Sequence, residues 1–356
     1  MKPPGSEVRV RLVDVAAHAG VSMKTVSNVV HRNPHVSPAM RARVERSIDE
    51  LGYRPNLTAR RLATGRTGML ALALPEMDQP YYAELARHVA EIAPEFGYRV
   101  LMEQTLLSAD AEHAVIGDSE NGVVDGILLH SVRMSPAEIS ALPRDVPLVL
   151  LGESAPPAAD HVMIDNVAAA RAVIQHLVDA GRRRIAFLGT VVDELSDATA
   201  PRLRGYHEAL DELGTAMGDR HVLLCAGYSV EASEAALSRA LADGLQVDAV
   251  MCREDRFAVG ALRALLRAGR RVPEDVAVVG WDDTQPARWA HPQLSSLSPD
   301  KRALARAALR LLHERITGYQ GAGRHLVVPH RLVVRASSQP RGDGGGAVDR
   351  RTSSRG

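Results

Sequence analysis

The chain has 356 residues, and its 43 Lys and Arg balance its 43 Asp and Glu, so the formal net charge is zero. Its two cysteines, Cys225 and Cys252, have no CxxC or Cys/His spacing, which argues against a disulfide framework or a zinc site. The first residues hold no apolar run typical of a signal peptide and no stretch is apolar enough to span a bilayer, so we expect a cytoplasmic protein without membrane contact or cofactor.

The neutral average hides an uneven distribution of charge. Residues 1–66 hold 12 Lys and Arg against 5 Asp and Glu, whereas the rest of the chain holds 31 against 38. A small basic segment joined to a larger acidic one is typical of a nucleic-acid-binding module attached to a second domain. A basic segment can also be a solvated surface, so charge alone does not decide between the two.

The segment Leu12–Val30 predicts two short helices joined by a tight turn at Gly20. Ser22 is a good N-cap for the second helix, because its hydroxyl can accept from a free backbone N–H. Three valines, at positions 26, 29 and 30, share one arc of that helix. The opposite arc holds Met23, Lys24, Ser27, Asn28 and His31. This arc suits a DNA major groove, although many amphipathic helix pairs with a polar face bind nothing.

Residues 54–66 predict a helix of only about eight residues, between a cap at Asn56 and a stop at Gly65. So short a helix is marginal in water, and we expect it to gain order only when something holds it. Arg60 and Arg61 would approach phosphates, and Leu62 would be exposed unless it finds an apolar partner or wedges between bases. The alternative is an ordinary linker.

After about residue 68 the sequence alternates between apolar runs and amphipathic segments. The runs predict buried strands at 69–74, 126–129, 146–151, 185–189, 249–252 and 276–280. Helical patterns separate them, for example at 167–179 and 256–268. This alternation implies parallel sheets covered by helices on both faces, and the length exceeds one core, so we expect two α/β lobes. The tails 1–9 and 341–356 are expected to be disordered.

The sequence contains none of the common catalytic motifs that we searched for. It has no GxxxxGK[ST] loop, HExxH helix or GxSxG turn, and no GxGxxG after the first strand. The His-Glu pairs at 207–208 and 313–314 have no second histidine four residues after the first. We therefore expect that the protein is not an enzyme.

Together these segments resemble the lactose/galactose-repressor family of bacterial transcription regulators. The resemblance covers about residues 10–338 and rests on an ordered series of motifs: VDVAAHAGVSMKTVSNVV, VSPAMRARVERSIDELGYRPNLTARRL, VVDGILL, MIDN, GRRRIAFLG, RLRGYHEAL, DAVMC, RVPEDVAVVGWDD, HPQLSSL and RLVVRASS. It implies an all-α helix-turn-helix head at 10–54, a hinge helix at 55–66 and an α/β core at 67–340. The core would resemble periplasmic sugar-binding proteins, with lobe 1 at about 67–164 and 298–323 and lobe 2 at about 165–297 and 324–340.

The resemblance assigns DNA contacts to the head and the hinge. The base-reading positions become Met23, Lys24 and Asn28, which can cover a thymine methyl, donate to guanine and pair with adenine, respectively. The other assigned positions are Ser22, Thr25 and Ser27 near phosphates, Asn56 at the backbone, and Ala59 and Leu62 in the minor groove. The family implies a homodimer on a near-palindromic operator in double-stranded DNA. No apolar heptad repeat follows residue 340, which favours a dimer over a coiled-coil tetramer.

The resemblance also assigns effector contacts, to Tyr82, Arg202, Tyr228 and Asp282. Guanidinium and carboxylate groups suit sugar hydroxyls, and aromatic faces suit sugar C–H surfaces.

Other interpretations remain open for the neighbours of these positions. Asp165 and Asp255 each precede a helix and can be N-caps, and Tyr81 and Trp281 can be packing residues. Glu254 stands where the family often has Asn, so it either alters the ligand or faces solvent.

The sequence thus predicts a DNA-binding repressor whose operator affinity is changed allosterically by a small molecule, with a sugar as the expected effector. Movement of the lobes would change the spacing of the two hinge helices in the dimer, and the linkage would be reciprocal. A nucleobase effector and either sign of response remain open. The alternative class is a solute-binding receptor without gene control, against which the basic head argues.

Overall fold

The computed structural model describes residues 10–30, 35–53, 66–143, 146–152, 159–191, 199–214 and 218–339. The chain divides into two compact units, with the division between Thr67 and Gly68. Both predicted tails and the hinge positions Asn56, Ala59 and Leu62 lie outside the described residues. The first unit is called the head below, and the second is called the core.

The described part of the head consists of three helices, α1 (Leu12–Ala19), α2 (Met23–Val30) and α3 (Pro38–Leu51). Gly20 ends α1 with φ of 63° and its N–H donates to the carbonyls of Ala16 and Ala17, so the turn uses a left-handed conformation that favours glycine. The three helices enclose a small apolar core. Its buried residues are Val15, Ala16, Ala19, Val26, Val29, Val44 and Tyr53. The predicted helix-turn-helix is therefore confirmed.

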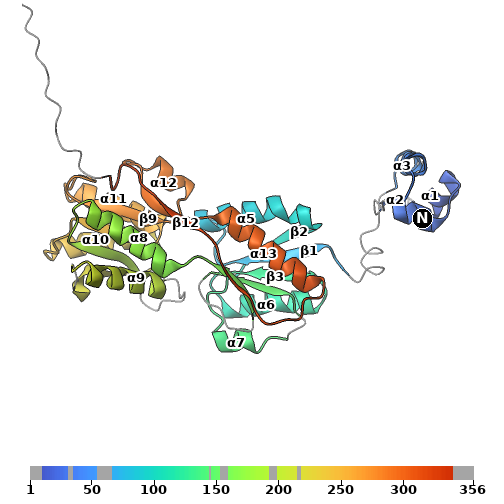
Figure 1. Cartoon of the computed structure of the whole chain (residues 1–356). Coiled ribbons are helices and arrows are strands. Elements are labelled where there is room, and N and C mark those ends of the chain that lie inside the picture. The colour runs from blue at the N-terminus through green and yellow to red at the C-terminus, as the bar shows by residue number, and fades with distance from the viewer. Residues whose placement is uncertain are drawn as a thin grey trace, which may run out of the picture. The chain divides into compact units, whose positions relative to one another are not determined.

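Lobe 1 of the core is built on a parallel sheet in the order β11-β5-β4-β3-β1-β2. Its strands are β1 (Met69–Leu74), β2 (Arg99–Gln104), β3 (Gly126–Leu129), β4 (Leu148–Leu151), β5 (Asp160–Met163) and β11 (His325–Val327). Helices α5 (Pro80–Ile92) and α13 (Lys301–Ile316) pack together on one face of the sheet (Figure 1). The short helix η1 (Ala93–Phe96) follows α5, and α6 (Ala109–Glu120) and α7 (Pro136–Ser140) cover the other face.

Lobe 2 repeats this plan with the strand order β12-β10-β9-β8-β6-β7, in which β12 alone is antiparallel to its neighbour. Its strands are β6 (Ile185–Val191), β7 (Val222–Cys225), β8 (Ala249–Cys252), β9 (Ala277–Trp281), β10 (Ser295–Pro299) and β12 (His330–Val333). Its helices are α8 (Asn166–Asp179), α9 (Thr199–Glu212), η2 (Asp219–His221), α10 (Val230–Ala242), α11 (Asp255–Arg267) and α12 (Gln285–Trp289). The predicted α/β fold with two lobes is confirmed.

The chain passes between the lobes three times: after β5, after β10 and after β11. The passages are hydrogen-bonded to one another, because Val328 N donates to Met163 O at 2.8 Å and Asp300 N donates to Pro329 O at 3.0 Å. Residues 325–327 pair with β5 in lobe 1, although the sequence prediction placed about 324–340 in lobe 2. Strand β10 ends at Pro299, close to the border predicted at about 298. Pro329, which has no N–H to donate, separates the apolar stretch into β11 and β12, and this sets the last passage.

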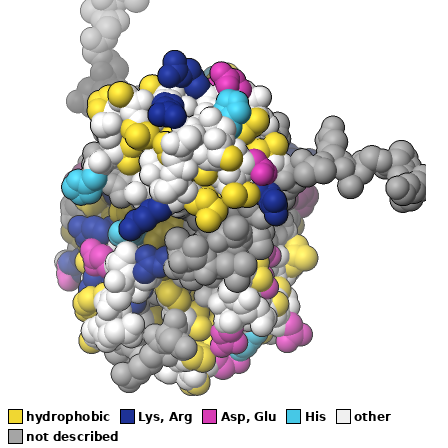
Figure 2. All heavy atoms as spheres, turned by 90° about the vertical axis from the view of Figure 1, so that its right-hand side faces the viewer, with side chains coloured by type: hydrophobic (Ala, Val, Ile, Leu, Met, Phe, Trp, Pro, Cys, Tyr) yellow, Lys and Arg dark blue, Asp and Glu magenta, His cyan; other side chains and the backbone are white. Residues whose placement is uncertain are grey.

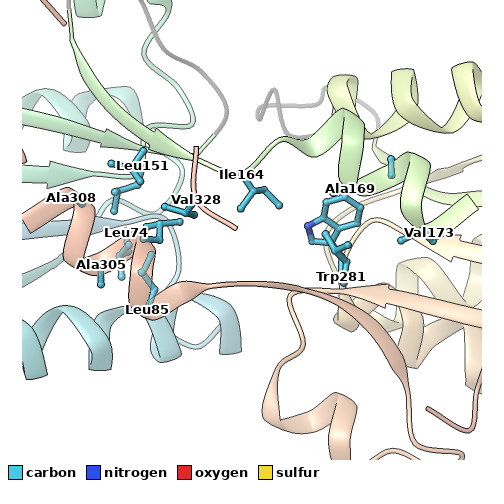
Figure 3. Close-up of a cluster of buried hydrophobic side chains, with 14 of the residues drawn as sticks. Leu74, Leu85, Leu151, Ile164, Ala169, Val173, Trp281, Ala305, Ala308 and Val328 are labelled. Carbon is cyan, nitrogen blue, oxygen red and sulfur yellow. The ribbon is translucent and has the colours of Figure 1, made fainter. Parts of the chain in front are cut away.

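One apolar cluster runs through both lobes. Figure 3 shows Leu74, Leu85 and Leu151 on the side of lobe 1 and Trp281 on the side of lobe 2, with Ile164 between them. Trp281 is fully buried. The residues packed between the two lobes are therefore apolar, and the indole of Trp281 is one of them.

On the face that Figure 2 shows, basic, acidic and apolar side chains are interspersed. In the part of the chain that the structure describes, we find no helix that is apolar and long enough to cross a membrane.

Candidate functional site

Helix α2 of the head presents the predicted base-reading side chains. Val26 and Val29 are buried, whereas Met23 and Lys24 are exposed, with Met23 at 55%. Ser27 and Asn28 lie half-buried on the same helix. An ammonium, an amide and a flexible thioether thus lie within two turns, and these groups can read base edges.

Ser22 and Thr25 have a structural task at the start of α2. Ser22 Oγ accepts from Thr25 N at 3.1 Å and lies 2.9 Å from Thr25 Oγ1. This is the predicted N-cap, and it fixes the direction in which α2 leaves the turn.

The core contains a cleft between its two lobes, at the carboxyl ends of the parallel strands. The cleft holds about 570 Å³ of space not filled by protein, part of it open to solvent. From lobe 1 it is lined by Gln79, Tyr81, Tyr82, His130, Gly152, Met163 and Ile164. From lobe 2 it is lined by Arg202, Arg253, Glu254, Trp281 and Asp282, and Pro299 and Leu304 complete it. Three of the four predicted effector residues, Tyr82, Arg202 and Asp282, therefore line one cleft.

Arg202 is held rigidly although it carries a charge. Its side chain is 8% exposed, its Nε donates to Asn166 Oδ1 at 3.0 Å and its Nη1 donates to Arg253 O at 2.6 Å. The guanidinium lies over the Trp281 ring, 4.3 Å from the centroid. The indole face supports one side of the guanidinium, which is thereby fixed as a planar donor at the cleft.

Asp282 follows the last residue of β9 and lies in the left-handed region, with φ of 97°. It is 5% exposed, and burial raises its pKa to about 8, a shift that Arg202 opposes and that Asp255 and Glu254 increase. Lys301 opposes the shift as well. Asp282 is thus a buried acid whose charged form is disfavoured by burial and by its acidic neighbours and is favoured by Arg202 and Lys301.

The two proposed N-caps have different outcomes. Asp165 Oδ1 accepts from Ala168 N at 2.9 Å, so its interpretation as the cap of α8 is confirmed. The same interpretation is wrong for Asp255, because Glu254 is the N-cap residue of α11. The Asp255 carboxylate instead accepts from Thr284 N at 2.7 Å and from Ser296 Oγ at 2.6 Å. Burial raises the pKa of Asp255 to about 6, and these hydrogen bonds oppose the shift.

The predicted aromatic contacts lie in two places. Tyr82 is in the main cleft, with its ring edge-on to His130 at 4.9 Å between centroids. Tyr228 lines an adjoining cavity of about 380 Å³, where the guanidinium of Arg253 lies 4.7 Å from its ring. Gln79, Tyr82, Arg253 and Glu254 border both cavities. Tyr228 therefore lies outside the main cleft, in a cavity that shares part of its lining.

Four polar residues of the cleft were not assigned from the sequence: Gln79, His130, Arg253 and Glu254. Glu254 is 9% exposed, and its carboxylate lies 3.5 Å from Gln79 Nε2 and 2.9 Å from Arg256 Nε, so it does not face solvent. His130 and Arg253 directly follow the strands β3 and β8. Their position after a buried strand was a signal that could have found them, since ligands bind at the carboxyl ends of parallel strands.

The fold and the site together define a class: a DNA-binding head with an exposed recognition helix, joined to a two-lobed core with a ligand cleft. Comparison with known proteins agrees. Residues 11–56 match the family model for bacterial regulatory proteins of the lacI family, and residues 174–338 match that for the periplasmic binding protein-like domain. The chain belongs to the lacI family of bacterial transcription regulators.

Individual relatives match over nearly their full length. The HTH-type transcriptional regulator CelR of Thermobifida fusca is 37% identical over 91% of this chain and 96% of its own. A solved complex of CelR with cellobiose matches with a TM-score of 0.69 and 35% identity, over 92% of this chain and all of that one. The lac repressor dimer bound to operator and an anti-inducer matches with a TM-score of 0.81 and 26% identity, over 92% and 99% of the two chains.

Proposed function

We propose that the protein is a homodimeric repressor whose affinity for operator DNA is changed by a carbohydrate bound in the core cleft. The observation that carries the proposal is the group formed by Arg202, Trp281 and Asp282. There a fixed guanidinium, an aromatic face and a buried carboxylate lie together between the two lobes. Sugars present hydroxyl groups, for which this group offers donors and an acceptor, and C–H faces, for which the partly buried ring of Tyr82 in the same cleft offers an apolar surface.

The relatives narrow the choice of effector. CelR, whose solved complex contains cellobiose, is similar to this chain over its full length. The cleft shares lining residues with the cavity at Tyr228, so a ligand that extends beyond the cleft on that side would meet Tyr228. We therefore infer that a disaccharide such as cellobiose is the first effector to test.

The test is a mobility-shift assay with DNA from upstream of the gene, with and without cellobiose, glucose or hypoxanthine. We expect a specific complex whose stability changes in the presence of a sugar. A thermal-shift assay of the same samples reports binding independently, because a ligand of the folded state raises its stability. Stabilisation by hypoxanthine and not by sugars would favour a nucleobase effector. A sugar-binding protein that shifts no DNA would favour a receptor.

Lys24 and Asn28 are expected to contribute to sequence discrimination by the head. Replacing either with alanine removes one donor set from the exposed side of α2 and should cost about 1–3 kcal/mol at the affected base pair. Binding to a set of operators with single base changes measures this loss. Unchanged discrimination at every position in both variants would contradict the assignment of α2 to the major groove.

A further inference from the structure

A lysine that lies outside the cleft lining connects the two lobes next to Asp282. Lys301 is the first residue of α13 in lobe 1, and its side chain is only 7% exposed. Its Nζ donates to Glu84 Oε2 at 2.8 Å, to Asp282 O at 2.5 Å and to Asp283 O at 3.5 Å. An ammonium has three N–H donors, so these three oxygens account for all of them.

The two carbonyls belong to a strained turn in lobe 2. Asp282 and Asp283 have φ of 97° and 48°, a conformation that non-glycine residues adopt at a cost. Such a turn persists only where its surroundings hold it. Asp283 N donates to Ser296 Oγ at 2.9 Å, and the Asp283 carboxylate lies 2.6 Å from Arg335 Nη2. Lys301 supports the same turn from lobe 1, through its hydrogen bonds to the carbonyls of Asp282 and Asp283.

Glu84 binds both Lys301 and a backbone N–H of lobe 2. Its Oε2 accepts from Lys301, whereas its Oε1 accepts from Gln285 N of lobe 2 at 2.9 Å. Glu84 lies on α5, the helix that also places Tyr82 in the cleft. The ion pair between Lys301 and Glu84 therefore joins the turn that bears Asp282 to the helix that bears Tyr82.

We propose that Lys301, acting with Glu84, is a positioning residue. It holds the Asp282 carboxylate toward the effector and couples binding of the effector at Asp282 to the position of lobe 1. The inference rests on the proposed function insofar as Asp282 contacts the effector. Lys301 acts through Asp282 and α5, because its donors already serve protein oxygens. Its removal should weaken effector binding and, beyond that, reduce the effect of bound effector on DNA affinity.

The experiment uses the full-length chain with Lys301→Met, which keeps an unbranched stem without the charge. Arg302→Met is the matched control, because Arg302 is the next residue, its side chain is 55% exposed and its ion pair is with the exposed Glu91 of lobe 1. Lys301→Arg tests rescue by a conserved charge. Titration calorimetry gives the affinity for cellobiose, and operator binding with and without saturating cellobiose gives the coupling ratio.

We expect Lys301→Met to lower cellobiose affinity about tenfold and to bring the coupling ratio close to one, from a value in the range of about 5–150 typical of allosteric pairs. Operator affinity without effector should stay within about twofold, since the head is unchanged. Lys301→Arg should recover part of the coupling. A coupling ratio equal to wild type in Lys301→Met would overturn the inference.

A second readout is independent of the effector. The chain has two tryptophans, so in a Trp289→Phe background Trp281 alone reports on the strand end that carries Asp282. Trp281 is fully buried, and we expect Lys301→Met to increase its quenching by acrylamide, whereas Arg302→Met should not. Unchanged quenching would refute the positioning role even if cellobiose proves not to be the effector. If the wild-type protein binds no sugar, but Lys301→Met alters the quenching of Trp281 as expected, the result would refute the proposed function and leave the positioning role standing.

Discussion

Replacing Arg202 with alanine is expected to lower effector affinity about 100-fold or more and to abolish the effector response, while operator affinity in the absence of effector stays close to wild type. Hydrogen bonds to a charged group are worth about 1.5–3 kcal/mol each, so the loss of one costs about 10- to 150-fold and the loss of two costs more. The guanidinium is already held by Asn166, by the Arg253 carbonyl and by the Trp281 ring. Binding therefore requires little additional ordering of this side chain.

Two variants on the same helix make the Arg202 prediction specific. Arg204→Ala is the matched control, because Arg204 is 65% exposed and its guanidinium lies 3.9 Å from Glu208. Exposed pairs of this kind contribute little, so this variant should behave as wild type. Arg202→Lys keeps the charge but loses the planar donor set, and we expect it to recover only a small part of the affinity. A normal induction curve for Arg202→Ala, measured with a protein shown to be folded, would remove Arg202 from the effector site.

The sequence predicts the head well because its signals are local. Gly20 in a left-handed turn, the Ser22 cap and the buried arc of Val26 and Val29 all act within one or two helical turns. Six strands of the core are likewise visible as apolar runs, namely β1, β3, β4, β6, β8 and β9. Strand β2 was not predicted, because it lies at the edge of its sheet and mixes exposed with partly buried residues. The buried strands β5 and β10 were not predicted either, because polar residues interrupt their apolar pattern.

The site is less predictable, because its members meet through long-range packing. Asp255 precedes the helix predicted at 256–268 and so looks like its cap, yet its carboxylate accepts hydrogen bonds from Thr284 and Ser296, which follow it by 29 and 41 residues. No local pattern reveals those partners. The resemblance to a family places Arg202 and Asp282, but it does not show that the carboxylate of Glu254 faces Gln79 across the two lobes.

Effector affinity is expected to rise as the pH increases from about 6 to about 8 and then to level off, by up to about tenfold per pH unit. The reason is Asp282, whose pKa is raised to about 8 by burial. Below this value the unoccupied carboxyl is mostly protonated. A hydroxyl that donates to an ionised carboxylate gains more than one that donates to a neutral acid, so the effector favours the ionised form. Binding then releases a proton, and calorimetry in buffers of different ionisation enthalpy measures that release.

The same group fixes the sign of the stability change without effector. An acid whose pKa is higher in the folded state than in the unfolded chain holds its proton more tightly when folded. The free energy of unfolding therefore falls as the pH rises from about 4, the ordinary value for Asp, to about 8. Asp255 contributes in the same direction only up to about pH 6, where its own pKa lies. Burial lowers the pKa values of His176 and His330 from the ordinary 6.5, so these side chains contribute in the opposite direction around pH 6, and the interval from about 7 to 8 reports on Asp282.

The variant Asp282→Asn removes the charge of this residue but keeps a side chain of nearly the same shape, so it distinguishes effects of the charge from effects of packing. The amide keeps an acceptor at nearly the same volume, so we expect weaker binding above pH 8, no dependence of affinity on pH between about 6 and 8, and greater stability than wild type at pH 9. Asp211→Asn on α9, at an exposed position, is the control and should retain the wild-type slopes. Because the two slopes come from one carboxyl, they must disappear together. If Asp282→Asn loses the stability slope but keeps the affinity slope, the proton released on binding comes from another residue, and Asp282 does not receive the effector hydroxyl.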